Sequence, residues 1–234
     1  MAEKKIVIVQ LSGGNDYLNC VIPYNNPNYV DNRPNVRITE DEVIPIGNGL
    51  GMNPAMAPIK DLYDQGKVAV VHGVGYPVPN RSHFRSMDIW HTAEPTKVGN
   101  EGWLGNTINQ LHPQHDNVVA AVNFGSGLPR ALVSHGAPVA SVTDLETYGL
   151  MSHMGDTSQR DEALQAFRDM YTQALGSGPV MDYLSQTGLD ALKGADILGT
   201  VTEKYSSDVE YATNSFAKAM KGAAQVLQAD IGTR

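Results

Sequence analysis

Residues 4–24, KKIVIVQLSGGNDYLNCVIPY, join an apolar run to a Gly-Gly pair and then to a polar segment with one acid. The run at 6–11 is mostly β-branched and almost continuous, a pattern typical of a strand buried on both faces of a parallel sheet. Ligands of open α/β sheets bind beyond the carboxyl ends of such strands, and the pair Gly13-Gly14 allows a sharp turn there. The polar residues that we expect at this edge are Ser12, Asn15, Asp16 and Asn19.

A second apolar run, KVAVVH at 67–72, follows a predicted helix. The helix is expected to begin at Asn53-Pro54, because Asn is a favoured cap and Pro suits the first helical position, and to end at Gly66. Strand, helix and strand in this order predict a right-handed βαβ unit with parallel strands. The Pro- and Asn-rich span 25–53 is expected to be a long surface excursion with short strands near 36–38 and 43–46.

The rest of the chain extends this pattern. Strands are expected at 117–123 and 138–142, and helices at 80–92, 103–111, 158–175, 179–202 and 208–231. We therefore predict an α/β fold with a mostly parallel sheet flanked by helices and a helical C-terminal part. Residues 1–156 would form the α/β core, and residues 157–234 a helical segment that packs on the core or acts as a lid.

Composition narrows the classes of function. The 234 residues carry a net charge of -8, which argues against a nucleic-acid partner, and no apolar run approaches the length of a membrane span. Cys20 is the single cysteine, so an internal disulfide is excluded, and we expect it to be a small buried apolar residue. The N-terminus enters the first apolar run without a visible signal peptide, which predicts a cytoplasmic protein.

Four stretches resemble the opening motifs of the "domain of unknown function 1501" family: LSGGNDYLNCVIPY, GLGMNPAMAPIKDLYDQGKVAVVHGVGYP, PNRSHFRSMDIW and EGWLGNTI. The tail, YATNSFAKAMKGAAQVLQADIGTR, is similar to the helix that precedes the family's next strand. The family is grouped with sulfatase-like, alkaline-phosphatase-type hydrolases. The resemblance therefore implies an incomplete alkaline-phosphatase-like fold and a metal-dependent hydrolase of phosphate or sulfate esters.

The resemblance also implies partners. Family members carry an Asp-Thr-His motif and a later His-Gly motif after that helix, and this sequence stops at Arg234 before either. The expected partners are a small anionic ester, a partner chain that supplies the C-terminal half, or a second copy in a homo-oligomer; without such a segment we expect no activity. Because many members carry a twin-arginine signal, export, with that signal absent here, is the alternative to a cytoplasmic location.

Asp16 and His72 end the two predicted strands and are the candidate metal ligands, for Zn, Mn or Ca. The superfamily places an Asp after its first strand for this purpose. The alternative for Asp16 is a residue that stabilises a turn through its own side chain, and the alternative for His72 is a hydrogen-bonded structural role.

Ser82 is the candidate nucleophile, in the first turn of a helix whose free N–H groups favour an anion. Arg81 and His83 would steady that anion, the former through its two-pronged guanidinium. The alternatives are an ordinary helix cap for Ser82 and a surface salt bridge for Arg81. Aligning 79–81 with the sulfatase Pro-Ser-Arg signature puts Pro77, which cannot attack, at the nucleophile position, so the nucleophile's identity stays open.

Two functions follow from these residues. The first is the ester hydrolase, in which Asp16 and Ser82 converge on a shared pocket. The second is a non-catalytic binding or assembly protein on the same scaffold, which would use the long polar span, the C-terminal helices and any uncovered sheet edge or apolar face to bind partners.

Overall fold

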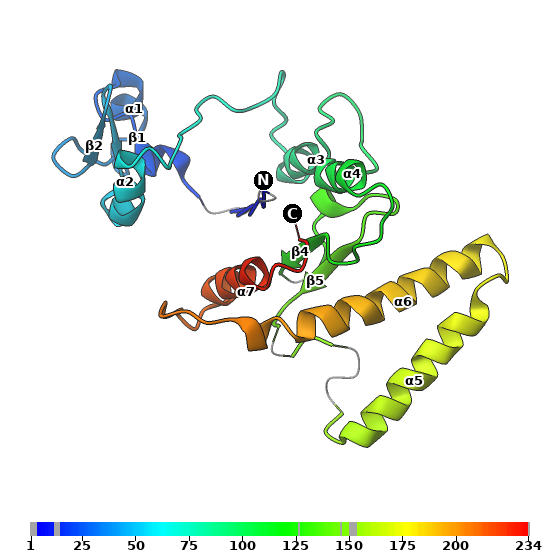
Figure 1. Ribbon diagram of the computed structural model, residues 1–234. Helices are drawn as coiled ribbons and strands as arrows, with labels where there is room; N and C mark the ends of the chain where they lie inside the picture. The colour runs from blue at the N-terminus through cyan, green and yellow to red at the C-terminus, as the bar shows by residue number, and fades with distance from the viewer. Residues whose placement is uncertain (1–3, 12–14, 126, 146, 150–153, 234) are drawn as a thin grey trace. The chain divides into compact units, whose positions relative to one another are not determined.

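The computed structural model describes residues 4–11, 15–125, 127–145, 147–149 and 154–233 (Figure 1). The chain forms two compact units: a small unit, Ile8–Gly75, and a large unit, Met1–Val7 with Tyr76–Arg234. Ser12, Gly13 and Gly14, which we expected at a sheet edge, lie outside the described residues.

The small unit is built around an antiparallel sheet of three short strands. β1 (Val21–Ile22), β3 (Leu50–Met52) and β2 (Ile44–Gly47) lie in the order β1-β3-β2. The connection between β2 and β3 passes through three residues with positive φ, at 47–49, where glycine and asparagine are the residues that tolerate this conformation. Ile22, Tyr29 and Val43 form the buried core beneath it.

A network of hydrogen bonds around Asn19 connects the segments of this unit. The Asn19 amide donates to the carbonyl of Val36 at 2.8 Å, and its carbonyl oxygen accepts from the Tyr29 hydroxyl at 2.8 Å. The Asn53 amide donates to the Asn19 backbone carbonyl at 2.9 Å, which ties the start of the next helix to the same residue. The helical elements here are η1 (Tyr17–Asn19), α1 (Pro27–Asn32), η2 (Pro54–Met56) and α2 (Ala57–Asp64).

The large unit contains one pair of parallel strands, β4 (Ala121–Phe124) and β5 (Val139–Val142), with Ala121 opposite Val139. Its main core joins the strand region to the C-terminal helices and includes Val119, Val142, Leu198 and Val226. The remaining elements before β5 are α3 (His83–Thr92), α4 (Trp103–Leu111) and η3 (Arg130–Leu132).

Long helices make up the C-terminal part of the large unit. α5 (Thr157–Ala174) and α6 (Pro179–Gly199) lie side by side as a hairpin in Figure 1, and Gly188 sits against the ring of Tyr171, where a Cβ atom would clash. η4 (Thr202–Lys204) then leads to α7 (Ser215–Ala229), which packs beside β4. The three helices expected after residue 157 are therefore present. No helix among the described residues is both long and apolar enough to cross a membrane.

The predicted mostly parallel, alkaline-phosphatase-like sheet is wrong. Neither 6–11 nor 67–72 is a strand, so the expected βαβ unit does not form. Its helix is present, as η2 and α2. Of the two short strands expected in the span 25–53, the one near 43–46 is confirmed as β2, whereas 36–38 is not a strand; with β3 as well, the span contributes most of the small unit's antiparallel sheet. The first run spans the boundary between the units at 7–8, the second lies shortly before the boundary at 75–76, and neither pairs with a strand that the structure describes. The division into 1–156 and 157–234 remains a prediction.

A carboxylate between two arginines holds α3 to η3 in the large unit. Arg85 donates to Asp88 Oδ2 at 2.6 Å, and Arg130 pairs with the other oxygen. Arg85 also donates to the carbonyls of Glu94 and Lys97, at 3.0 and 2.7 Å, and thus fixes the loop after α3. The Asp88 side chain is only 13% exposed, so its charge depends on these partners.

We expect Asp88→Ala to lower the free energy of unfolding by about 2–4 kcal/mol, because it leaves two partly buried guanidinium groups without their anion. Asp64→Ala is the matched control: Asp64 pairs with Lys60 on the exposed face of α2, and such a pair contributes at most about 0.5 kcal/mol. Urea unfolding of the two variants measures the difference, and equal effects would contradict the structural role of Asp88.

Candidate functional site

Asp16, a candidate metal ligand, lies at the start of η1 in the small unit. Both of its carboxylate oxygens accept from Arg33, whose Nη1 and Nη2 lie 2.6 and 3.0 Å away. This two-pronged hydrogen bonding is the main reason why the pKa of Asp16 falls below its ordinary value. The charged carboxylate is therefore favoured, but its oxygens are occupied by a cation from the protein itself.

His72, the second candidate ligand, is held by the residue next to Asp16. Its Nδ1 lies 2.9 Å from the hydroxyl of Tyr17, and the two rings meet edge to face with centroids 5.8 Å apart. This contact joins the start of η1 to the end of the second apolar run. It also gives His72 the hydrogen-bonded structural role that was its alternative.

The described residues do not fit a resident metal ion. No group of three His, Cys, Asp or Glu side chains among them is placed to hold one. Asp16 is engaged by Arg33, and one ring nitrogen of His72 is engaged by Tyr17. A divalent metal at this position therefore stays a prediction from the resemblance, and no chemistry is derived through it.

Ser82 is the N-cap of α3 in the large unit. Its hydroxyl accepts from the backbone N–H of Arg85 at 3.4 Å, and its own N–H donates to the side chain of Asn80 at 2.8 Å. His83 is the first helical residue, and both Arg81 and His83 are exposed. The serine thus occupies the anion-favouring helix start that the sequence predicted, and it also performs the capping role that was the alternative.

The five predicted site residues fall into two groups. Asp16 and His72 belong to the small unit, whereas Arg81, Ser82 and His83 belong to the large unit. Each group lies within one unit. The convergence of Asp16 and Ser82 on one pocket remains a prediction.

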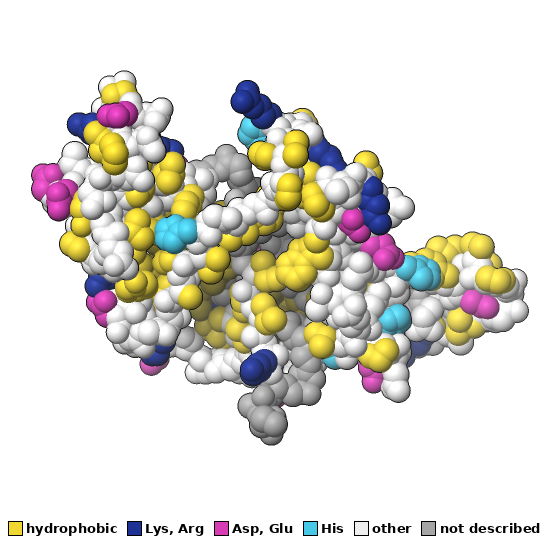
Figure 2. Space-filling model, turned by 90° about the horizontal axis from the view of Figure 1, so that it is seen from above, with side chains coloured by type: hydrophobic (Ala, Val, Ile, Leu, Met, Phe, Trp, Pro, Cys, Tyr) yellow, Lys and Arg dark blue, Asp and Glu magenta, His cyan; other side chains and the backbone are white. Residues whose placement is uncertain are grey.

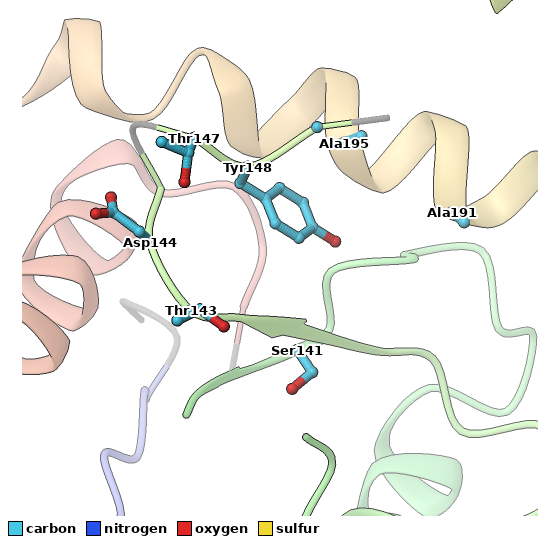
Figure 3. Close-up of a pocket in the computed structure, with 8 residues that line it drawn as sticks. Ser141, Thr143, Asp144, Thr147, Tyr148, Ala191 and Ala195 are labelled. Atoms are coloured by element: carbon cyan, nitrogen blue, oxygen red, sulfur yellow. The ribbon is translucent and has the colours of Figure 1, made fainter. Parts of the chain in front are cut away.

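The large unit contains a cavity that sequence reasoning missed, of about 340 Å³, at the carboxyl end of β5. Its lining comes from the end of the strand, the following loop and two alanines of α6: Ser141, Thr143, Asp144, Thr147, Tyr148, Gly149, Ala191 and Ala195. Figure 3 shows Tyr148 directed into the space between β5 and α6, with the carboxylate of Asp144 turned away from it. The strand at 138–142 was predicted, so its carboxyl end was the available signal for this site.

Hydroxyl groups dominate the polar lining. Ser141 Oγ accepts from the amide of Asn123 at 2.9 Å, and that amide also donates to the Gly127 carbonyl at 2.9 Å. Tyr148 packs one side of its ring on the main core, and burial raises the pKa of its hydroxyl. The Tyr148 phenol is therefore neutral at physiological pH and available as a donor and an acceptor.

Comparisons with protein-family models, with curated proteins and with solved structures found no match for this chain.

The ion pair of Asp16 predicts a pH-dependent stability. Because the pKa of Asp16 is lowered in the folded state, its contribution is full above the ordinary value of 3.8 and disappears as the pH falls through the lower folded value. Wild type should therefore melt above Asp16→Asn at pH 7, and the difference in melting temperature should vanish in acid. Asp31→Asn, at an exposed position of α1, is the control, and an equal pH-dependent difference for both variants would contradict the assignment.

Proposed function

We propose that this chain is an assembly protein. It associates through the first apolar run, 6–11, and through residues 68–74, which comprise most of the second apolar run and the two residues that follow it. Neither run belongs to a strand among the described residues. Yet seven of their large apolar side chains are exposed, led by Ile6 at 72% and Val71 at 69%. Figure 2 shows hydrophobic side chains reaching the surface in several places. Runs of β-branched residues without strand partners are the segments most prone to pair with another chain.

The magnitudes favour an association that uses several of these side chains at once. Complete burial of one Val, Leu or Ile side chain contributes about 1.5–3 kcal/mol. Association itself costs about 4–15 kcal/mol, so one or two residues are insufficient and a whole run is needed. The exposed residues that supply it are Ile6, Val7, Ile8, Val9, Leu11, Val71 and Val74.

A second copy of this chain is the partner that fits these runs. A two-fold axis pairs a run with its own counterpart in the antiparallel sense, so each residue pair occurs twice. Lysines precede both runs, at 4–5 and 67, and the runs themselves contain no Asp, Glu, Lys or Arg. Antiparallel pairing places the lysines of the two copies at opposite ends, which avoids the repulsion that parallel pairing would create.

Sedimentation equilibrium tests this proposal. We expect the wild type to self-associate, and Val71→Lys to raise the dissociation constant about 10–100-fold, because it replaces one buried valine by a charge. Val98→Lys is the matched control, since Val98 is also 69% exposed but lies outside both runs. A monomeric wild type, or equal effects of the two lysine variants, would rule the proposal out.

An ester hydrolase is the second candidate, and the contact between Tyr17 and His72 favours it. That contact joins His72 to Tyr17, the sequence neighbour of Asp16, although the two candidate metal ligands are far apart in the sequence. The family resemblance implies a metal ligand at Asp16 only, whereas His72 is a candidate because it ends the second expected strand. The substrate class would be a phosphate or sulfate ester.

Calorimetric titration with Zn²⁺, Mn²⁺ and Ca²⁺ tests the hydrolase proposal. Asp16→Ala removes both the proposed ligand and the ion pair, whereas Arg33→Met removes the ion pair and leaves the carboxylate. We expect metal binding in the wild type and in Arg33→Met and its loss in Asp16→Ala. Where metal binds, Ser82→Asp, which retains an N-cap, should abolish hydrolysis of a chromogenic ester. Absence of metal binding in the wild type would refute this candidate.

A further inference from the structure

We propose that the hairpin of α5 and α6 joins two copies of this chain through an apolar patch near its turn, completing a four-helix bundle. This hairpin patch consists of large apolar side chains that are 42–72% exposed: Met170, Leu175, Val180, Met181 and Leu184. The inference goes beyond the proposed assembly, since the hairpin, at 157–199, contains neither apolar run.

The packing of the large unit leaves this end of the hairpin uncovered. None of the described residues of α5 is buried, and the large buried side chains of α6, Leu192 and Leu198, lie in its C-terminal half. Figure 1 shows the turn between the helices at the end of the hairpin away from β4 and β5, and hydrophobic side chains gather at this end in Figure 2. The N-terminus of α5, which the undescribed residues 150–153 precede, lies about 20 Å along the helix from Met170.

The charged residues of both helices avoid the hairpin patch. With about 100° of rotation per residue, the charges of α5 fall within about 200° of its circumference, and Met170 lies outside this sector with Ala163 and Ala166. The charges of α6 fall within about 120°, and Val180 and Leu184 lie on the opposite side of the helix. The charged residues of the hairpin are Arg160, Asp161, Glu162, Arg168, Asp169, Asp182, Asp190, Lys193 and Asp196.

This distribution of charge favours a second copy as the partner. Two copies that each carry a net charge of -8 repel each other, so they meet most readily where neither presents a charged side chain. Two antiparallel helices with an uncovered apolar face form half of a four-helix bundle, and an identical hairpin supplies the other half. A two-fold axis makes such a contact complementary to itself.

The size of the hairpin patch agrees with what a stable dimer needs. A standard interface buries about 800 Å² per partner, and about 65% of a homodimer interface is apolar, which is about 500 Å². Each half-exposed side chain of the patch presents on the order of 100 Å² of apolar surface, so that the five together present about 500 Å². Exposed patches of this size on a soluble protein mark interaction sites.

Sedimentation equilibrium of purified Val71→Lys protein tests the inference, because this variant weakens association through the apolar runs and leaves the association through the hairpin to be measured. We expect a dimer. In the same background, Val180→Lys should raise the dissociation constant about 10–100-fold, because a charge replaces a valine that the dimer buries. Val209→Lys is the matched control, since Val209 is 61% exposed and lies outside the hairpin.

NMR of the methionine methyl groups gives a second measurement that requires no change in the hairpin patch. The signals of Met170 and Met181 should shift as the protein concentration rises, whereas that of Met87, a partly buried residue of α3, should not. Circular dichroism checks that the lysine variants are folded.

The inference fails if Val71→Lys protein is monomeric up to about 1 mM, the weak end of specific association, which would leave a different protein as the occupant of the patch. It also fails if Val180→Lys and Val209→Lys have equal effects, or if the signals of Met170 and Met181 do not shift. The proposed association through the apolar runs fails separately, if Val71→Lys associates as tightly as the wild type while Val180→Lys dissociates.

Discussion

The organisation of this protein depends on the packing within each of its two units, in which the two apolar runs have no strand partners among the described residues. Backbone N–H and C=O groups must be paired wherever they are buried, and each unit has its own sheet and helices in which to pair them. The small unit uses an antiparallel sheet of short strands, and the large unit uses the pair β4–β5 with helices beside it. The chain passes between the units at 7–8 and 75–76, at or next to the runs whose composition would otherwise place them inside a sheet.

Polar networks compensate for the small cores. In the small unit, the side chain and backbone of Asn19 connect η1, α1 and the start of η2. In the large unit, Asp88 joins α3 to η3 through Arg85 and Arg130. Such networks specify geometry more than they add stability, because the gain of each hydrogen bond is offset by lost hydration.

The candidate residues illustrate how structural and chemical roles overlap. Asp16 has a charged carboxylate and Ser82 has a hydroxyl at a helix start, and both are already engaged by neighbours. The cavity beside β5 differs, because four of its lining residues carry hydroxyl groups, although the Ser141 hydroxyl already accepts from Asn123.

The sequence by itself determined the local elements. Helix α4 has the predicted bounds, α5, α6 and β5 are close to theirs, and Asn53 caps η2 as expected, because caps, turns and helical periodicity act over a few residues. Only the tertiary structure decided which residues pair with Asp16 and with Asp88. It also decided that the apolar runs are not strands. Arg33 lies 17 residues from Asp16 in the sequence, and Arg130 lies much further from Asp88. No local sequence pattern predicts either ion pair. The run at 6–11 has strand composition, but whether a run becomes a strand depends on a second segment reaching it, which is a property of the packed chain rather than of its residues.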